Sequence, residues 1–339
     1  MNSTPPNLPT AGEPLRVLFV AAEADPWVKV GGLGDFAGAL PQALHSLPPE
    51  HAGGSRLDIR LVLPCHDVIR QVLHPKNPLV EFTILRGAVE VAGAAYLETS
   101  GEQQVLLIDG PPFQTGAPVY SSDSKQSAEQ YTFFSLAALE TTRRLGWKPH
   151  ILHANDWHTA IAVYWLFLHR SRVPFFSKTR TVFSLHNLPY FGYNAEETLT
   201  SYGIPPAADP RLPTWARHLP LPLGLHAADK IVAVSPTYAR EILTPAFGCG
   251  LQDYLKTRSN SISGILNGLD TDAWNPASDP ALEAHFDAHD LTPRSINKEA
   301  LQRELELSLL PDVPLLALIS RLDPLKGVDL VIDGVRQMS

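Results

Sequence analysis

The stretch Leu15-Arg-Val-Leu-Phe-Val-Ala-Ala22, followed by Lys29-Val-Gly-Gly-Leu-Gly-Asp35, decides the fold of this chain. The first segment is a continuous apolar run, which is typical of a parallel strand buried on both faces. The second segment leads into a helical pattern that begins near Phe36. A buried strand joined to a helix by a short glycine-rich connection predicts an α/β fold.

The glycine-rich connection also suggests a ligand. Gly31, Gly32 and Gly34 would let backbone N–H groups turn toward a bound group. The helix N-terminus favours negative charge there, Lys29 adds a positive charge, and Asp35 closes the segment. A diphosphate or its attached sugar is therefore one interpretation. A turn that requires positive φ and binds nothing is the other, because the spacing matches neither the dinucleotide fingerprint nor the P-loop.

Apolar runs alternate with helical patterns along the rest of the chain. Strands are expected at 15–22, 58–63, 80–85, 105–108, 151–154, 181–185, 231–234, 262–266 and 315–319, and helices at 36–47, 128–145, 159–170, 236–243, 297–307 and 328–338. This alternation predicts parallel βαβ units in an open sheet, with 80–99 as an appended antiparallel hairpin. The first helix should be bent or broken around Pro41.

Length, charge and cysteine content limit the number of domains, the possible partners and the cellular location. A length of 339 residues predicts about two domains, and a net charge of −8 argues against nucleic acid and anionic membrane as partners. The only two cysteines, Cys65 and Cys249, are too few for a disulfide framework. Residues 1–14 contain no apolar segment of a secretory signal and should form a flexible tail. The longest apolar run, 160–168, is too short to cross a bilayer, so we expect a cytoplasmic protein.

Polar signatures directly follow six of the expected strands. They are 29–35, 155–158, 186–187, 235–237, 267–270 and 321–326. In an open parallel sheet the carboxyl ends of the strands share one edge, where ligands bind. The sequence therefore predicts the functional site at this edge.

Two of these signatures carry side chains suited to a sugar. Asp156, beside Trp157, is either a carboxylate at the edge of a carbohydrate ring or a helix N-cap. His186 and Asn187 either bind sugar hydroxyls or are structural. A zinc site with His153, Asp156, His158 and His186 as ligands is a weaker alternative, because no metal-binding motif is present.

Arg321 and Lys326 follow the last expected strand, at the start of a helix. Two cations at a helix N-terminus form a phosphate clamp, in which arginine binds two oxygens and lysine acts as a point charge. Exposed cations that bind only water are the alternative. The final segment forms one βα unit, which is too small to fold as an independent domain.

Together these segments resemble the bacterial and plant glycogen and starch synthases, which form α-1,4-glucan from a nucleotide sugar. The resemblance is carried, in order, by Lys29–Asp35, His153-Ala-Asn-Asp-Trp-His158, Ser184-Leu-His-Asn-Leu-Pro-Tyr190, Val234-Ser-Pro-Thr-Tyr-Ala-Arg-Glu-Ile242, Phe247-Gly-Cys-Gly-Leu251, Gly264-Ile-Leu-Asn-Gly-Leu-Asp270, Trp274-Asn-Pro276 and Ser320-Arg-Leu-Asp-Pro-Leu-Lys-Gly327. Asn155 stands where many members have His, and Leu325 where many have Gln.

The resemblance implies a GT-B fold, in which two Rossmann-like domains face a cleft. It also implies transfer of glucose from ADP-glucose, with UDP-glucose left open, to the non-reducing end of glycogen or a maltooligosaccharide, with retention of configuration and without cofactor or metal. Lys29 would contact the donor, Asp156 and His186 the transferred glucose, and Asn267 would lie near the sugar. Arg321 and Lys326 would neutralise the diphosphate.

On this basis residues 15–270 form the N-terminal, acceptor-side domain. Residues 271–310 form a connector, and 311–339 begin a second, nucleotide-sugar-binding domain. The family's later donor motifs have no counterpart here, so the chain alone should be nearly inactive. Two alternatives are a glucan-binding fragment without catalysis and a related GT-B glycosyltransferase with another donor.

Overall fold

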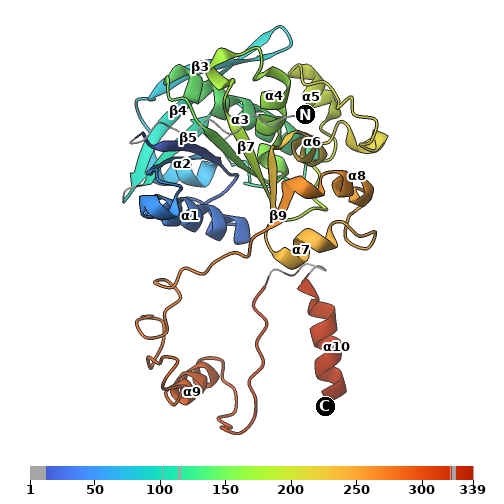
Figure 1. Cartoon of the computed structure of the whole chain (residues 1–339). Helices are drawn as coiled ribbons and strands as arrows, with labels where there is room; N and C mark the ends of the chain where they lie inside the picture. The colour runs from blue at the N-terminus through green and yellow to red at the C-terminus, as the bar shows by residue number, and fades with distance from the viewer. Residues whose placement is uncertain (1–12, 102, 114–115, 321, 323–325, 339) are drawn as a thin grey trace. The chain divides into compact units, whose positions relative to one another are not determined.

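The computed structural model describes residues 13–338 apart from 102, 114–115, 321 and 323–325 (Figure 1). Two compact units divide the chain between Asn267 and Gly268. The first unit contains the sheet, and the described part of the second contains two α-helices.

The described strands of the first unit form one nine-stranded sheet in the order β3-β4-β5-β2-β1-β6-β7-β8-β9. Their bounds are β1 Leu15–Val20, β2 Leu57–Pro64, β3 Val80–Arg86, β4 Val89–Ser100, β5 Gln103–Asp109, β6 Ile151–Asn155, β7 Arg180–Leu185, β8 Lys230–Ala233 and β9 Ile262–Gly264. All neighbouring pairs are parallel except β3–β4 and β4–β5. The predicted parallel sheet with an antiparallel hairpin at one edge is therefore confirmed.

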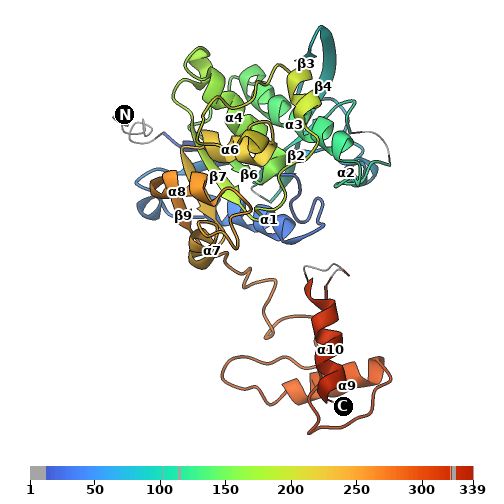
Figure 2. The same cartoon turned by 90° about the vertical axis from the view of Figure 1, so that its right-hand side faces the viewer.

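Helices cover both faces of this sheet. The α-helices of the first unit are α1 Gly32–His45, α2 Asp67–Leu73, α3 Ser124–Arg144, α4 Ala160–His169, α5 Glu196–Ser201, α6 Pro220–Ala227, α7 Pro236–Glu241 and α8 Gln252–Thr257. Helices α3, α4 and α6 lie over one face and α1 and α2 over the other, as two perpendicular views show (Figures 1 and 2). Strand β1 is buried on both faces. Leu18 and Val20 belong to one apolar core, and Val17 and Phe19 belong to the other. Such alternation explains why the strand reads as a continuous apolar run.

Helix α1 begins earlier than expected and passes through Pro41. Of the two expectations, bent or broken, the break is wrong because the helix is continuous across Pro41. Proline removes one backbone hydrogen bond, but Ala37, Gly38 and Pro41 are all buried. Their packing outweighs the single lost bond.

The chain direction across the sheet reverses at β1. The chain passes from β1 to β2 on one side and later returns to place β6 on the other. Such a switch point opens a crevice at the carboxyl ends of the two strands, which is where open α/β sheets bind ligands.

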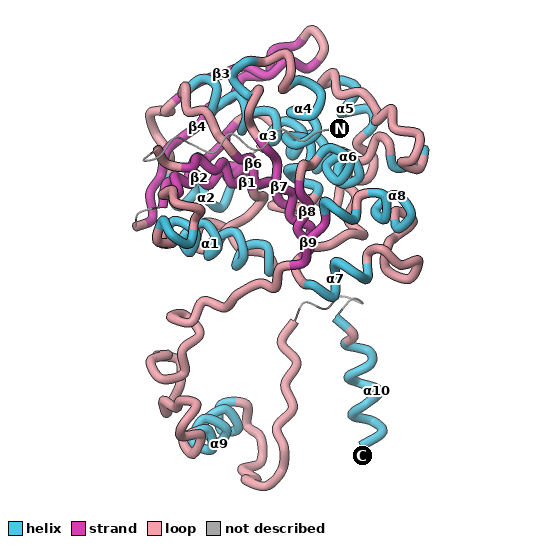
Figure 3. Tube along the Cα trace, viewed as in Figure 1, coloured by secondary structure: helices cyan, strands magenta, loops and turns pink. Residues whose placement is uncertain are grey.

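The second unit contains α9 Arg294–Glu304 and α10 Val328–Met338, close to the two helices expected there. The strand expected at 315–319 is not formed (Figure 3). Among the described residues of this unit there is no neighbouring strand to pair with it. Ile319 is accordingly 97% exposed, since an apolar run becomes a strand only when a partner satisfies its backbone. In the described ranges, no helix combines the length and apolar character that a membrane span needs.

Candidate functional site

Asp156 lies directly after β6, and its carboxylate holds the loop that follows β7. It is 7% exposed, and its φ of 53° is unusual for a residue other than glycine. One carboxylate oxygen, Oδ1, accepts the backbone N–H groups of His186 at 2.8 Å and Asn187 at 3.4 Å. Asp156 stands at the N-cap position of the short 3-10 helix Trp157–Thr159, as the alternative expected, but its carboxylate makes no capping hydrogen bond. Burial raises the pKa of Asp156 to about 7, against the opposing effect of the two backbone hydrogen bonds.

His186 follows β7 and is held in one orientation. Its Nε2 lies 3.1 Å from Oδ1 of Asn155, and the amide nitrogen of Asn155 donates to the carbonyl of Val20 at 3.0 Å. Because the amide nitrogen is used by Val20, Oδ1 must accept, and Nε2 of His186 carries the proton. Burial lowers the pKa of His186 to about 4, so the imidazole is neutral at pH 7 and Nδ1 is left as an acceptor.

Helix α1 closes this part of the crevice. The ring of Phe36 meets the His186 ring edge to face, with centroids 4.6 Å apart. Elements that follow β1, β6 and β7 therefore converge at the switch point. This is the edge of the sheet at which the sequence predicts the site.

Lys29 occupies a more exposed position beside α1. Its Nζ lies 2.5 Å from a carboxylate oxygen of Asp35 and 3.6 Å from one of Asp25. The hydrogen bond to Asp35 is the main cause of the raised pKa of Lys29, and 44% of the lysine side chain is exposed. Lys29 is thus a charged side chain held by two exposed carboxylates.

The glycines beside Lys29 do not act as the sequence suggested. Gly31 has extended backbone, Gly32 and Gly34 lie inside α1, and none of the three has positive φ. The backbone N–H groups of Val30 and Gly31 already donate to the buried carboxylate of Glu23. Gly34 is needed for packing instead: a Cβ there would lie 3.1 Å from Cγ of Lys29. The expected positive φ is therefore wrong, and the amides of Val30 and Gly31 are bound by Glu23.

The other predicted site residues are distributed over both units. Asn187 is half-buried beside His186, and Asn267 is exposed at the end of the first unit. Lys326 is exposed and belongs to the second unit, just before α10. Arg321 lies outside the described residues.

Two supporting residues have roles that sequence reasoning did not assign. Asn155 orients His186, and a polar residue at the end of a buried strand was the available signal. The hydroxyl of Tyr238, on α7, accepts the backbone N–H of Leu188 at 2.9 Å and so fixes the loop after His186. The Ser235 signature itself is a helix cap, since its hydroxyl accepts the Tyr238 N–H at 2.9 Å.

The histidines of the zinc alternative have other partners. His153 shares a 2.8 Å hydrogen bond with Ser184, and the His158 ring packs 4.5 Å from that of Tyr131. Burial lowers the pKa of both histidines to about 3. Among the residues the structure describes, no group of three or more His, Cys, Asp or Glu side chains is arranged to hold a metal ion.

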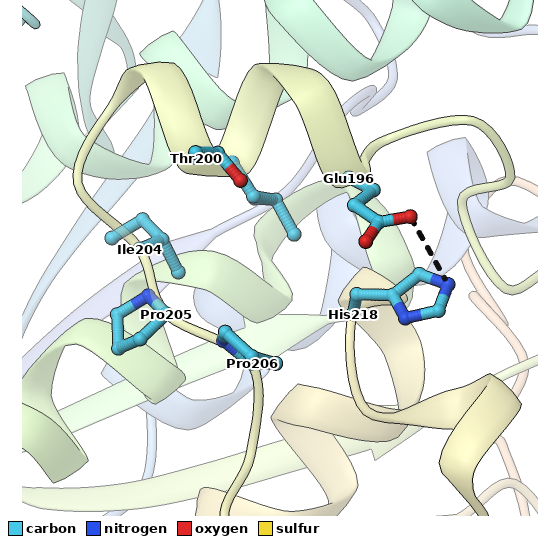
Figure 4. A pocket seen from close by; sticks show the side chains of 7 residues that line it. Glu196, Thr200, Ile204, Pro205, Pro206 and His218 are labelled. Atoms are coloured by element: carbon cyan, nitrogen blue, oxygen red, sulfur yellow. Dashed lines mark ion pairs between the residues drawn. The ribbon is translucent and has the colours of Figure 1, made fainter.

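A separate small hollow lies between α5 and the loop that follows it (Figure 4). Its wall combines apolar side chains with Glu196, Thr200 and His218, and His218 lies 3.8 Å from the carboxylate of Glu196. None of the predicted site residues lines it. It serves below as a reference surface.

Comparison with known proteins identifies the family. The model of the starch synthase catalytic domain matches residues 16–257, which is more than two thirds of the chain. The chain belongs to the starch synthase catalytic-domain family. The predicted resemblance is thereby confirmed.

Named relatives agree with this assignment. Glycogen synthases from Anaeromyxobacter dehalogenans and Aromatoleum aromaticum are 38% and 37% identical, over 94% and 96% of this chain. The chain spans 65% of the length of each. The catalytic domain of starch synthase IV from Arabidopsis thaliana, bound to ADP and acarbose, matches with a TM-score of 0.81 and 29% identity, covering 96% of this chain and 66% of that one. The predicted GT-B type of α/β fold is supported by this match.

Proposed function

We propose that this chain carries the acceptor-side part of a glucosyltransferase that moves glucose from ADP-glucose to the non-reducing end of an α-1,4-glucan with retention. The observation that carries the proposal is the constellation at the switch point. A neutral histidine and a buried carboxylate lie beside the helix that follows the cationic Lys29 segment. The names of the relatives and the ADP and acarbose bound to the Arabidopsis protein support it.

Each group has a task that fits its environment. His186 offers an oriented Nδ1 acceptor to a sugar hydroxyl, and Asp156 holds the backbone of that histidine in place. Lys29, with Arg321 and Lys326 of the second unit, would stabilise negative charge as the bond between glucose and the diphosphate breaks. The new bond forms from the anomeric carbon of glucose to the oxygen of the glucan hydroxyl, and the proton of that hydroxyl passes to the departing diphosphate. Asn187, Asn267 and Gly31, Gly32, Gly34 and Asp35 are proposed to line the same substrates, in a cytoplasmic enzyme.

The decisive experiment measures incorporation of labelled glucose into glycogen. One protein is the 339-residue chain, and the other, the completed protein, is the chain extended with the C-terminal third of the Anaeromyxobacter dehalogenans relative. We expect transfer by the completed protein and little by the chain alone, because the donor needs both domains. Failure of the completed protein to transfer glucose from ADP-glucose, UDP-glucose or any other donor tested would contradict the proposal.

The same samples separate the alternatives. Transfer from UDP-glucose but not ADP-glucose would identify a related enzyme with another donor. Calorimetry that detects maltoheptaose binding to the completed protein, without nucleotide-sugar binding, would favour a glucan-binding protein without catalysis.

A further inference from the structure

Glu23 is a buried carboxylate three residues after β1, and none of the roles above uses it. It is 2% exposed. Its Oε2 accepts the backbone N–H groups of Val30 and Gly31, the latter at 3.1 Å, and its Oε1 accepts the Tyr120 hydroxyl at 2.9 Å. A buried carboxylate is tolerated only when donors compensate for its lost hydration, and here both oxygens are satisfied.

One side of this network fixes the Lys29 segment. The two amides that Glu23 accepts belong to the residues directly after Lys29. The segment also lies tightly against α1: a Cβ on Gly34 would be 3.2 Å from Oε2 of Glu23 and 3.2 Å from Cα of Lys29. A Cβ on Gly38, one turn later, would be 2.3 Å from the carbonyl oxygen of Asp25. The position of Lys29 is therefore determined by Glu23 and by the glycine face of α1.

The other side reaches the segment after β6. The Tyr120 ring lies 5.0 Å from the His158 ring, whose centroid is 4.2 Å from that of Trp157, the neighbour of Asp156. Burial raises the pKa of the Tyr120 hydroxyl, so it remains a donor to Glu23. A single carboxylate thus links the segment that carries Lys29 to the aromatic cluster beside Asp156.

We propose that Glu23 is a positioning residue that acts through Lys29 and Tyr120 and holds two substrate-facing segments in one geometry. The proposal rests on the proposed function for its catalytic meaning. The positioning of the two segments does not depend on that function, because the hydrogen bonds of Glu23 form without substrate.

The first test is hydrogen exchange of the 339-residue chain without ligand, followed by mass spectrometry. Glu23→Asp keeps the charge but is one methylene too short to reach the amides and the phenol together. It should accelerate exchange in residues 29–34 by about 10-fold, because these amides lose protection once local opening becomes easier. Glu23→Gln retains an acceptor for the amides and a group that pairs with the phenol, and should stay within about 3-fold of the native chain. Unchanged exchange in Glu23→Asp would overturn the proposal, as would acceleration spread evenly over the chain.

The second test is a double-mutant cycle on the KM for ADP-glucose of the completed protein. If Glu23 acts through Lys29, Glu23→Asp should raise this KM by about 10-fold in the native background and by less than about 2-fold when Lys29→Ala is present. Equal factors in both backgrounds would show independent effects and overturn the link to Lys29. If even the unmutated completed protein transfers no glucose, the proposed function fails, whereas the exchange result still decides whether Glu23 positions the segment.

Discussion

Two groups of candidate site residues are held in place by different interactions, one by buried hydrogen bonds and the other by exposed ion pairs. The buried group, formed by Asp156 and Asn155 with the half-buried His186, is uncharged at His186, and its Asp156 and Asn155 side chains make hydrogen bonds to backbone. The charged rim, formed by Lys29 with Asp25 and Asp35, is exposed and held by ion pairs. Exposed ion pairs are weak because water competes for both charges, so a ligand phosphate can replace a carboxylate of the rim at little cost. Buried hydrogen bonds have no such substitute, because a lost partner leaves a polar group unpaired.

The difference indicates a division of labour. The rim suits a mobile, charged ligand such as a diphosphate, whereas the buried group suits a neutral ring that needs a fixed orientation. Mutations in the buried group should therefore affect the transition state. Those in the rim should mainly affect donor affinity.

The largest effect is expected for His186→Ala. Removal of an oriented group at the reacting sugar should lower kcat/KM of the completed protein by about 10²–10³-fold. His218→Ala, in the hollow between α5 and its loop, is the matched control and should leave the rate within about 2-fold. Comparable losses of kcat/KM in the two variants would show that His186 has no specific role in the reaction.

The second effect concerns pH. The folded pKa of Asp156 is raised to about 7, so the folded state binds more protons than the unfolded state above pH 4. Stability from this group is therefore full below pH 4 and is lost as pH rises toward and through 7. Relative to Asp156→Asn, the native chain should lose about 2 kcal/mol of unfolding free energy between pH 5 and 7.5. Urea unfolding at the two pH values measures this, and a constant difference would mean that the carboxyl is already ionised at pH 5.

His186 titrates in the opposite direction. Its pKa is lowered to about 4, so its contribution to stability is present above its ordinary pKa of about 6.5 and is lost as pH falls toward 4. This change is common to the native chain and Asp156→Asn, so it cancels in the comparison.

A smaller effect is expected at the rim. Lys29→Ala should raise the KM for ADP-glucose of the completed protein by about 10-fold, with kcat changed less than about 3-fold, because one charged contact is lost. Lys125→Ala, which removes an exposed cation paired with Glu197 at 3.4 Å, is the control and should leave both constants unchanged. A fall in kcat without a change in KM would place Lys29 in the transition state instead.

The smallest effect is expected for Asp35→Asn. It removes one exposed partner of Lys29, and such pairs are weak. The free energy of unfolding of the 339-residue chain should change by less than about 0.5 kcal/mol in urea titrations. A loss above about 1.5 kcal/mol would show that the rim is as rigid as the buried group.

Most of the sheet could be predicted from sequence because its strands coincide with apolar runs, as at Leu15–Val20. Helix α6 was not predicted. Pro220 and Pro222 read as loop residues, yet they lie in the first turn of the helix, where the backbone N–H is not needed. The strand expected at 315–319 fails for the reverse reason, since its pairing depends on a neighbour that the sequence pattern does not reveal.

The candidate site, too, could be predicted only in part from the sequence. Positions after parallel strands predicted that Asp156 and His186 would meet, because strand order places their loops side by side. The orientation of His186 by Asn155 and the hold of Glu23 on residues 30–31 depend on contacts between distant segments. A single glutamate after a strand forms no motif, so only the folded chain reveals its partners.

The central claim is that a glucosyl unit is bound at the switch point of the sheet. Amide NMR of the 339-residue chain during titration with maltoheptaose tests it most directly. The account predicts that shifts concentrate in the segments after β6 and β7, at residues 156–158 and 186–188, with none at 196–206 beside the hollow of Figure 4. Shifts centred on 196–206, or no shifts at saturating sugar, would contradict it.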